Sequence, residues 1–491
     1  MPVLVLVSVL YVFLATAGTF GELPEPSDGY DRMAEGFRAG HLYLQETPPK
    51  ELLEAEDPYA DKVALLGLWD ASLYGGRYYY YWGPVPALLV VAYKGISGSA
   101  ATVSDLWLTL LFMLGRFYGG AALILALCRL RAISPPTWLI VLAVAVFGLS
   151  GPAPFIVARP QVYEACLAAG QCFLVWGLWA AFRGLYTGRR TKWFALAGCL
   201  FGLAMGSRVT NWLAVPSVLA ITLATSWWQS RDSGSPWRRT LLRDALALGT
   251  PVACVAIAYA AYNHARFGSF SEFGAKYQIT LQKFWWHESF VLPNILSYLW
   301  APLDWSCRFP FASAPTSRNP PFLVGHWPPG YEIWEKVAGV LVMAPWCYFL
   351  IASVVRLMIC AWGRATRFGS PSALSIAPLE LWAISCSLAA MPTIVPALGL
   401  WEASMRYSGD PLGGAVIGAT LGAFWLVRLT NAADGLIRQQ VRGLVIAAGA
   451  YTCLIGTFSA FASYFDPFKH QNPELYQKLE SSLSLCEAEK R

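Results

Sequence analysis

Residues 2–44, PVLVLVSVLYVFLATAGTFGELPEPSDGYDRMAEGFRAGHLYL, decide the fold, because an apolar run passes there into a polar and acidic one. The apolar part, residues 2–20, is long enough to cross a bilayer, which takes about 20 residues. Ala15-Thr16-Ala17 resembles a signal-peptide cleavage site, but no Lys or Arg precedes the apolar run, so we favour a retained first helix. The polar part opens a loop, residues 21–83, that ends in the aromatic run from Tyr74 to Trp82. We expect this loop to carry the chemistry, held over a site at the water–lipid boundary.

The composition places the chain among multi-span membrane proteins. Of its 491 residues, 56% are hydrophobic and only 13% are charged, with a mean hydropathy of +0.45. The net charge of +6 is too small to indicate a nucleic-acid partner. Most of the 11 cysteines lie in apolar segments without a CxxC pair, which is typical of buried residues. Only Cys307 and Cys486 fall in predicted outer segments, which leaves a disulfide between them open.

Apolar runs predict about eleven spans, counting residues 2–20. The others are residues 105–128, 136–157, 161–182, 193–207, 209–228, 244–262, 333–355, 377–399, 411–427 and 442–464. Residues 84–97 are barely long enough to cross and contain Pro84, Pro86 and Lys94, so they are better read as an interfacial or re-entrant helix. The total changes by one or two if 84–97 and 193–228 are divided differently.

Basic residues orient the chain, because Lys and Arg are retained on the cytoplasmic side. If 84–97 does not cross, the Arg-rich connections all fall on one side; they are residues 129–131, 183–192, 231–243, 356–367 and 428–442. The membrane domain is then residues 1–464, with outer loops at 21–105 and 263–331 and a short non-cytoplasmic tail at 465–491. Residues 288–303 predict a second interfacial helix, and Glu380 is expected to be solvated near a cytoplasmic helix end.

Ionisable side chains at the outer ends of predicted spans are the strongest candidates for function, because charge near hydrocarbon needs a partner or a purpose. They are Asp28, Asp31, Arg159, Glu164, Arg208, Arg406 and Asp410. Carboxylates and guanidiniums on one face suit glycosyl transfer from a lipid phosphate, in which a carboxylate deprotonates the acceptor and Arg stabilises the departing phosphate. The alternative is that these charges pair with one another and fix the loops.

Aromatic and basic residues of the outer loops offer a substrate groove. Tyr78, Tyr81, Trp82, Tyr277 and Tyr407 can line it, although aromatic residues at a membrane interface are also ordinary anchors. Lys276 can reach a donor phosphate. The histidines have no metal-binding spacing, so we expect no built metal site, while the carboxylates leave room for a loosely held divalent cation.

Several motifs occur in an order that resembles the GT-C membrane glycosyltransferases, in the branch with protein O-mannosyltransferases, aminoarabinose transferases and bacterial family-39-like relatives. The motifs are DGYDRMAEGFRAGHLYL, SLYGGRYYYYWGPVPALL, ARPQVYEA, GLAMGSRVTNWLAVP, YNHARFGSFSEFGAKYQ and MRYSGDP. The resemblance implies an all-α polytopic bundle of about 11–13 helices with interfacial helices in the first outer loop. It also implies a polyprenyl-phosphate sugar donor and a catalytic base in that loop.

Carried over to this sequence, the base falls on Asp28, with Asp31 as the near alternative. Gly29 follows Asp28 where the family often has Glu, and Gln161 follows the Arg-Pro turn where relatives often have Asp. Glu164 is then the nearest second acid, and Arg159, Arg208, Arg406 and Lys276 are the candidate phosphate ligands.

We therefore expect a multi-pass glycosyltransferase of a bacterial plasma membrane, with its catalytic loops on the non-cytoplasmic side. It would move a sugar from a polyprenyl phosphate to an acceptor lipid, glycan or protein. Two other functions remain open: a transporter or flippase, for which midplane charges and repeated halves are missing, and a non-catalytic GT-C-like scaffold.

Overall fold

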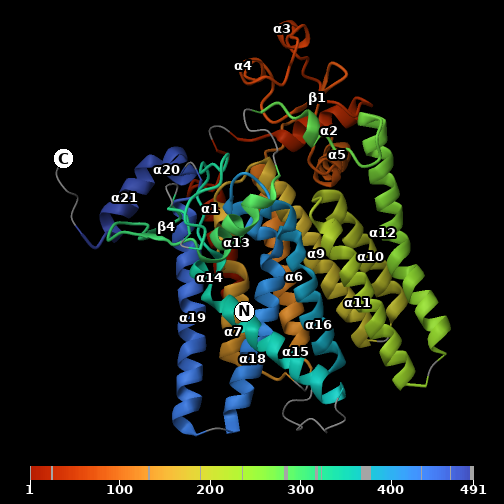
Figure 1. Ribbon diagram of the computed structural model, residues 1–491, viewed down its shortest axis with the longest axis vertical. Coiled ribbons are helices and arrows are strands. Elements are labelled where there is room, and N and C mark those ends of the chain that lie inside the picture. The colour runs from red at the N-terminus through yellow and green to blue at the C-terminus, as the bar shows by residue number, and fades with distance from the viewer. Residues whose placement is uncertain are drawn as a thin grey trace.

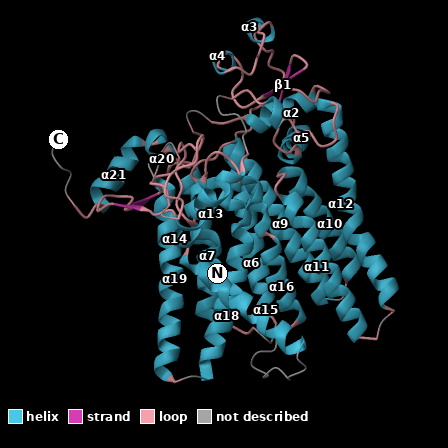
Figure 2. Cartoon of the chain, in the orientation of Figure 1, coloured by secondary structure: helices cyan, strands magenta, loops and turns pink. Residues whose placement is uncertain are grey.

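The computed structural model describes residues 2–23, 26–130, 133–187, 189–234, 236–280, 286–315, 319–321, 323–365, 377–432, 434–464 and 466–486. It shows an all-α polytopic membrane protein in which long helices form a bundle and shorter elements gather at one end (Figure 1). Strands are confined to short pairs in the loops (Figure 2). The all-α membrane fold expected from the apolar runs is therefore confirmed.

The longer bundle helices are α1 (Pro2–Ala15), α6 (Asp105–Leu127), α7 (Thr137–Leu149), α9 (Val162–Thr187), α10 (Arg190–Ser207), α11 (Asn211–Asp232), α12 (Trp237–Phe267), α15 (Phe349–Ala365), α16 (Pro378–Ala389), α18 (Gly409–Leu429) and α19 (Gly435–Phe461). Seven helical stretches in the described residues are long and apolar enough to span a membrane: those of α6, α9, α12, α15, α16 with α17, α18 and α19. Helices α1, α7, α10 and α11 pack beside them.

The shorter helices are α2 (Gly29–Arg38), α3 (Lys50–Leu53), α4 (Asp61–Ala64), α5 (Val85–Ser97), α8 (Ala153–Val157), α13 (Val291–Trp300), α14 (Val340–Met343), α17 (Val395–Leu398), α20 (Pro467–Gln471) and α21 (Pro473–Leu483). Single 3-10 turns are η1 (Ala275–Tyr277), η2 (Glu288–Phe290), η3 (Pro345–Tyr348), η5 (Met391–Ile394), η6 (Met405–Ser408) and η7 (Thr430–Ala432). The antiparallel pairs are β1 (Ser72–Tyr74) with β2 (Arg77–Tyr79), and β3 (Asp304–Trp305) with β4 (Ala312–Ser313).

Three predicted spans are wrong in detail. The helix expected over residues 2–20 ends at Ala15. Residues 136–157 do not form one helix, because α7 ends at Leu149 and α8 starts only at Ala153. Pro152 lies in the break, and proline disfavours the helical conformation of the residue before it. Residues 333–355 begin with a non-helical stretch, so the apolar helical segment there starts at Pro345.

The outer-loop segments gather at one end of the bundle. There α5 lies against α2, with α13, α20 and α21 nearby, whereas the α11–α12 and α18–α19 connections lie at the other end (Figure 1). Residues 131–132 and 366–376 of the other basic connections lie outside the described residues. The segregation agrees with the distribution of basic residues, and which end is cytoplasmic stays a prediction.

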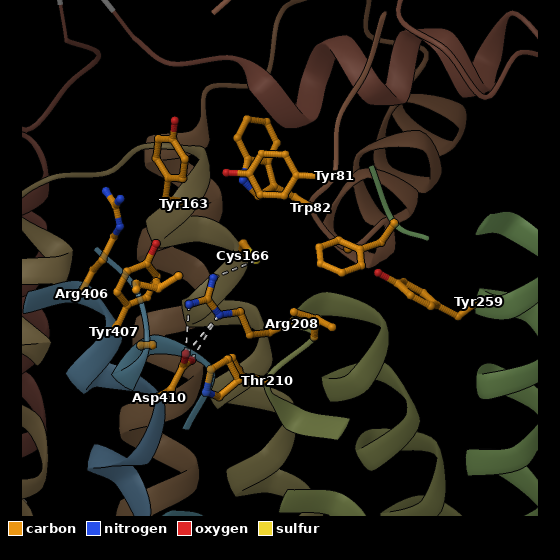
Figure 3. Close-up of a pocket in the computed structure, with 16 residues that line it drawn as sticks. Tyr81, Trp82, Tyr163, Cys166, Arg208, Thr210, Tyr259, Arg406, Tyr407 and Asp410 are labelled. Atoms are coloured by element: carbon orange, nitrogen blue, oxygen red, sulfur yellow. Dashed lines mark hydrogen bonds and ion pairs between the residues drawn. The ribbon is translucent and has the colours of Figure 1, made fainter. Parts of the chain in front are cut away.

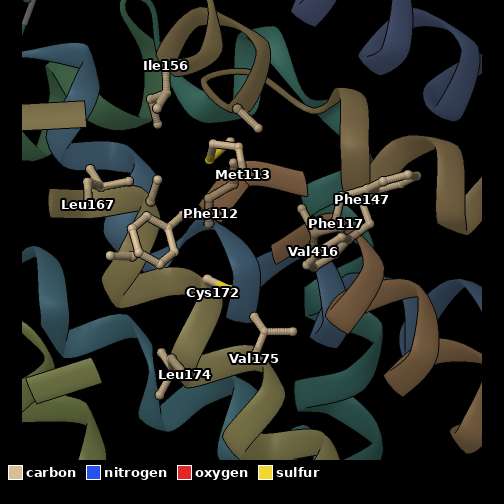
Figure 4. Packing of buried hydrophobic residues seen from close by; sticks show 14 of the residues in the cluster. Phe112, Met113, Phe117, Phe147, Ile156, Leu167, Cys172, Leu174, Val175 and Val416 are labelled. Carbon is tan, nitrogen blue, oxygen red and sulfur yellow. The ribbon is translucent and has the colours of Figure 1, made fainter. Parts of the chain in front are cut away.

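The bundle core is built from large apolar side chains set against small residues. Phe112, Phe117 and Phe147 meet side chains of α9 and α18 there (Figure 4). A Cβ added at Gly120 of α6 would lie 2.0 Å from Phe147, and one at Gly422 of α18 would lie 2.0 Å from the carbonyl oxygen of Phe349. Such close approaches are typical of membrane helices, which associate through packing rather than hydrophobic burial.

Candidate functional site

A pocket opens where the first loop, α9, the α10–α11 turn and the start of α18 meet (Figure 3). It encloses about 840 Å³ of space free of protein atoms, part of it open to solvent. Its lining residues are Tyr81, Trp82, Gly83, Tyr163, Cys166, Arg208, Val209, Thr210, Tyr259, Phe273, Pro396, Ala397, Leu400, Arg406, Tyr407 and Asp410. The sequence had singled out six of these: Tyr81, Trp82, Arg208, Arg406, Tyr407 and Asp410.

Arg208 lies at the floor of the pocket and pairs with Asp410. Its backbone is extended where α10 ends, so the side chain leaves the helix axis. Nη2 lies 3.0 Å from Asp410 Oδ2, and Nε lies 3.3 Å from both carboxylate oxygens. Nη1 is turned to the other side, 4.0 Å from Cys166 Sγ (Figure 3). One edge of the guanidinium is therefore neutralised by Asp410, and the other faces the pocket.

Arg406 contributes a second guanidinium to the pocket. It lies over the rings of Tyr163 and Tyr407, 4.8 and 5.3 Å from their centroids. Its Nη1 lies 2.9 Å from Glu335 Oε1. Stacking on aromatic rings and a carboxylate partner hold arginine in a defined orientation.

The aromatic end of the first loop forms one wall. The Trp82 ring meets Tyr163 edge to face at 5.3 Å and lies 5.1 Å from Tyr81. Gly83 allows this wall to reach α10, because a Cβ there would lie 2.3 Å from the carbonyl oxygen of Gly206. The Trp-Gly-Pro sequence thus brings the loop onto the membrane bundle.

Two buried polar atoms of the lining make no hydrogen bond of ordinary geometry among the described residues, although Trp82 interacts with Tyr81 and Thr210 with Asp410. They are Trp82 Nε1 and Thr210 Oγ1. Leaving a buried donor unsatisfied costs roughly 1–3 kcal/mol, so such atoms mark places where a ligand or water completes the site. With two guanidiniums alongside, the pocket is suited to an anion such as a phosphate.

The two predicted bases lie at the start of α2 and do not line the pocket. Asp28 accepts a hydrogen bond from Arg32 Nε at 2.7 Å and is partly exposed. Asp31 is buried, 2.6 Å from Lys94 Nζ, and also accepts from the amide of Val103. Asp31 is therefore committed to joining α2, α5 and the segment before α6.

Asp28 is nevertheless close to the start of α9. A Cβ at Gly29 would lie 2.8 Å from Val162 Cγ2, so α2 begins directly against the turn that carries Tyr163 and Glu164. This contact gives a steric reason for glycine at the position where the family often has Glu. The sequence shows that Gly29 replaces the Glu common in the family, but it does not show that Val162 lies next to this position.

Asp105, which the sequence analysis did not select, fixes this arrangement. Its carboxylate accepts hydrogen bonds from Ser27 Oγ at 2.6 Å and from the amides of Gly29 and Tyr30 at 2.9 and 3.2 Å. It thereby caps the N-terminus of α2 from a different helix, where a negative charge is favourable. The sequence feature that could have indicated Asp105 is an acidic residue at the first position of a long apolar run.

Glu164 is buried and pairs with Arg159, whose Nη1 lies 2.9 Å from Glu164 Oε1. Arg159 also donates to Gln161 and lies over the ring of Tyr464. The second carboxylate oxygen, Glu164 Oε2, has no hydrogen-bond partner in the described part of the chain. Arg159 and Glu164 are thus neighbours of the pocket residue Tyr163 without lining the pocket themselves.

Three of the other candidates lie in the outer part of the loops. Tyr78 is buried, and its hydroxyl accepts from the amide of Leu68 at 3.1 Å. Tyr277 packs on Tyr74 and Phe267, while Lys276 is exposed beside Tyr277. The structure therefore does not bring Tyr78, Lys276 and Tyr277 to the pocket.

Three carboxylates near Arg406, those of Glu335, Glu402 and Asp70, were not predicted as site residues. Glu335 pairs with Arg406, and burial together with Glu335 raises the pKa of Glu402 to about 7, although Arg406 opposes this. Burial also raises the pKa of Asp70, against a hydrogen bond from Gln278. Glu402 stands in WEASMRYSGDP and could have been noticed there, whereas nothing in the sequence singled out Glu335.

An apolar groove adjoins the pocket and shares Tyr259 with it. The groove, about 1010 Å³ in volume including open space, lies between α2, α5, α10 and α12. Its lining residues are Phe37, Gly40, His41, Leu42, Pro84, Val85, Leu88, Leu203, Gly206, Val255, Ala258, Tyr259 and Tyr262. A charged pocket thus lies next to a groove suited to a hydrocarbon chain. Among the described residues, no group of three His, Cys, Asp or Glu side chains is placed to hold a metal ion.

No protein-family model matches the chain, and no curated protein matches its sequence. Solved structures do match. The apo crystal structure of the Archaeoglobus fulgidus oligosaccharyltransferase gives a TM-score of 0.51 at 13% identity, covering 100% of this chain and 60% of that one. The same enzyme tethered with an acceptor peptide containing the NVT sequon gives 0.50 at 13%, over 100% and 59%. ArnT from Cupriavidus metallidurans, bound to undecaprenyl phosphate, gives 0.41 at 10%, over 97% and 78%.

The chain therefore spans about 60% of the length of the oligosaccharyltransferase that it matches. Over that length it shares the fold of the oligosaccharyltransferase. The fold that the motifs implied is confirmed.

Proposed function

We propose that the protein is a GT-C glycosyltransferase that takes a sugar from a polyprenyl-phosphate donor. The observation that carries the proposal is the pocket itself: two guanidiniums, Arg208 and Arg406, stand beside an apolar groove. A lipid phosphate has this pairing of a charged head and a hydrocarbon tail. The fold shared with an oligosaccharyltransferase supports the same proposed function.

In the proposed reaction the polyprenyl chain lies in the apolar groove and the phosphate in the pocket. The acceptor nucleophile attacks the anomeric carbon, the bond from that carbon to the phosphate oxygen breaks, and the configuration inverts. The electron pair leaves on the phosphate, where Arg208 and Arg406 stabilise the growing charge. The acceptor proton passes to a carboxylate.

We assign the base to Asp28 rather than Asp31. Asp31 is buried between Lys94 and the Val103 amide, whereas Asp28 is partly exposed at the start of α2, next to Gly29, which lies against Val162. Purified protein supplied with labelled polyprenyl-phosphate sugars and candidate acceptors tests the assignment. Asp28→Asn should reduce transfer by roughly a hundredfold or more, in the range of general-base catalysis, and leave donor binding intact. Wild-type transfer by both Asp28→Asn and Asp31→Asn would refute the mechanism.

We further propose that the pocket faces the non-cytoplasmic side of a bacterial plasma membrane. The basic connections at the far end of the bundle and a disulfide at the near end support this orientation. The acceptor would then be an envelope lipid, glycan or protein. Running the transfer assay with EDTA, and with Mg²⁺ or Mn²⁺ restored, tests whether the loop carboxylates hold a cation that the reaction needs.

A non-catalytic lipid-phosphate binder of the same fold is the second candidate. It is favoured by the ion pairs that already engage Asp28 with Arg32 and Glu164 with Arg159. The two functions differ in product: an enzyme releases free polyprenyl phosphate and a glycosylated acceptor, whereas a binder retains intact donor. Thin-layer chromatography of the labelled lipid after incubation distinguishes them.

A further inference from the structure

Two buried carboxylates, Glu335 and Glu402, lie beside Arg406 at the rim of the pocket. Each of these two residues is only 7% exposed. Glu335 Oε1 lies 2.9 Å from Arg406 Nη1, and its other oxygen accepts from the Ser404 hydroxyl. Glu402 Oε2 accepts from the amide of Trp334 at 3.2 Å and forms no salt bridge within the described ranges. One acid of the pair is therefore neutralised by Arg406, and the other is not.

The pair is held by two loop segments that run beside each other. Glu332 N donates to Trp401 O at 2.9 Å, and Ser404 N donates to the hydroxyl of Tyr298 on α13. The main-chain bond from Glu332 to Trp401 and the bond from the Trp334 amide to Glu402 join the segments before α14 and before η6, so Glu335 and Glu402 cannot separate without breaking them. The carboxylates are a fixed part of the environment of Arg406.

Charged and titratable groups also approach from the neighbouring elements. They are Asp70 from the first loop, Arg159 and Glu164 from the α8–α9 turn and α9, Tyr298 from α13, Tyr407 beside Arg406 and Tyr464 after α19. Arg159 is already paired with Glu164. Glu402 is the acid next to Arg406 that forms no salt bridge among the described residues.

We propose that Glu335 and Glu402 form an acid pair that sets how strongly Arg406 binds the donor phosphate, an inference that rests on the proposed function. Glu335 is a positioning residue that holds the guanidinium over Tyr163. Glu402 is the member of the pair that gains and loses a proton. When it is neutral, Arg406 has one counter-charge, and when it is ionised a second negative charge opposes the phosphate.

The sign of the pH dependence follows from the direction of the shift. Burial and Glu335 raise the pKa of Glu402 to about 7, so the carboxyl is protonated below that pH and ionised above it. Donor binding should therefore weaken as pH rises through 7. At an effective dielectric constant of about 20, a unit charge about 12–17 Å from the bound phosphate changes its affinity by roughly five- to tenfold, and a closer charge changes it by more.

The test measures binding of a fluorescent undecaprenyl phosphodiester to the purified full-length protein in nanodiscs between pH 5.5 and 8.5. A diester is used because its single charge does not titrate in this range, unlike that of a monoester. Wild type should lose about five- to tenfold in affinity across pH 7. Glu402→Gln should remove the step and bind at pH 8 as wild type does at pH 6. Glu332→Gln is the matched control, since Glu332 is exposed on the same segment and should keep the wild-type profile.

Glu335→Gln should move the binding step to a lower pH than in wild type, because the charge of Glu335 is one cause of the raised pKa of Glu402. A pH-independent wild type, or a step that survives in Glu402→Gln, would overturn the inference while leaving the proposed function standing. If the diester does not bind at any pH and Arg406→Ala changes nothing, the proposed function itself fails. Thermal melts of each variant separate loss of folding from loss of the step.

Discussion

Glycine at two positions of the first loop determines how Asp28, the proposed base, and the aromatic residues reach the bundle. Gly83 lies against the carbonyl of Gly206, and Gly29 lies against Val162. Gly29→Ala should push the start of α2 away from α9 and displace Asp28 while leaving Arg208 and Arg406 untouched. We expect transfer to fall roughly ten- to hundredfold, as misplacement of a reacting group by about 1 Å does. Donor affinity should stay at the wild-type value.

Gly95→Ala is the control for this change. Gly95 lies in α5 with no atom within 4 Å of an added Cβ, so alanine there should leave transfer unchanged. Rates and donor affinities are compared for both variants by initial-rate kinetics and lipid binding. Equal transfer rates for Gly29→Ala and wild type would show that Asp28 does not take part in the reaction.

The shape of the Arg208 side chain is a second residue-scale feature. It binds Asp410 through Nε and Nη2 and presents Nη1 to the pocket, which a lysine cannot do with its single ammonium group. Arg208→Lys should keep the ion pair and weaken donor binding by roughly tenfold, the value of one charge-assisted hydrogen bond. Lys276→Ala, at an exposed site outside the pocket, should bind donor like wild type. Equal losses in both would mean that charge alone, and not Arg208, attracts the lipid.

For single residues, the sequence predicted which charged side chains lie at the pocket, but not which residues they contact. Arg208, Arg406 and Asp410 were recognised because charge at the end of an apolar run is costly. Glu335, Asp105 and Val162 were missed because their importance comes from contacts with segments far away in the chain, as Glu335 with Arg406 and Asp105 with Gly29. Glu380 was expected in solvent, but it is buried and pairs with Arg356.

At the scale of elements, α12 links the aromatic wall of the pocket to the membrane bundle. Arg266 in its last turn is buried; Nη1 donates to Tyr80 O at 2.7 Å and Nη2 donates to Asn263 Oδ1 at 2.9 Å. Its guanidinium stacks on Tyr262, 3.8 Å from the ring centroid. This one side chain therefore holds the main chain just before Tyr81 and Trp82.

Arg266→Ala should free the aromatic wall from α12. The Tyr80 carbonyl would lose its partner at a cost of roughly 1–3 kcal/mol. Hydrogen exchange of residues 78–83 should speed up, and the KM for donor should rise more than kcat falls. Arg77→Ala, which removes an exposed arginine from the same hairpin, should change neither. Unchanged exchange in Arg266→Ala would show that packing of the rings alone holds the wall.

Long apolar runs predicted most of the helices. They did not predict where the helices next to the site begin and end. The division of residues 136–157 into α7 and α8 and the late start of α15 both place irregular backbone at the outer end, near Arg159 and Glu335. Hydropathy averages over about 20 residues and cannot register a break of three. The break before α8 ends seven residues before Arg159, and the non-helical stretch before α14 contains Glu335.

At the scale of the whole molecule, the two ends of the chain and the second outer loop are tied together. Asn472 Nδ2 donates to Ala17 O at 2.9 Å, Phe468 packs on Phe13, and the Cys307–Cys486 disulfide joins the tail to the β3–β4 loop. The tail thus fixes the outer end of α1, from which the first loop starts. Disulfides persist in oxidising compartments, so this bond and the basic connections at the opposite end indicate the same orientation.

The disulfide makes the orientation measurable in intact cells. A membrane-impermeant maleimide should leave Cys307 and Cys486 unlabelled until an impermeant reductant is added outside, and then label both without permeabilisation. Cys199 and Cys254 are the exposed free cysteines of the described chain, so a Cys199→Ser, Cys254→Ser background removes competing reaction. Labelling that needs permeabilised cells would place the pocket on the cytoplasmic side and, with it, exclude an acceptor outside the membrane. Loss of the bond in Cys307→Ser should also lower the free energy of unfolding by about 2–4 kcal/mol, because the tail and the loop are then free to separate.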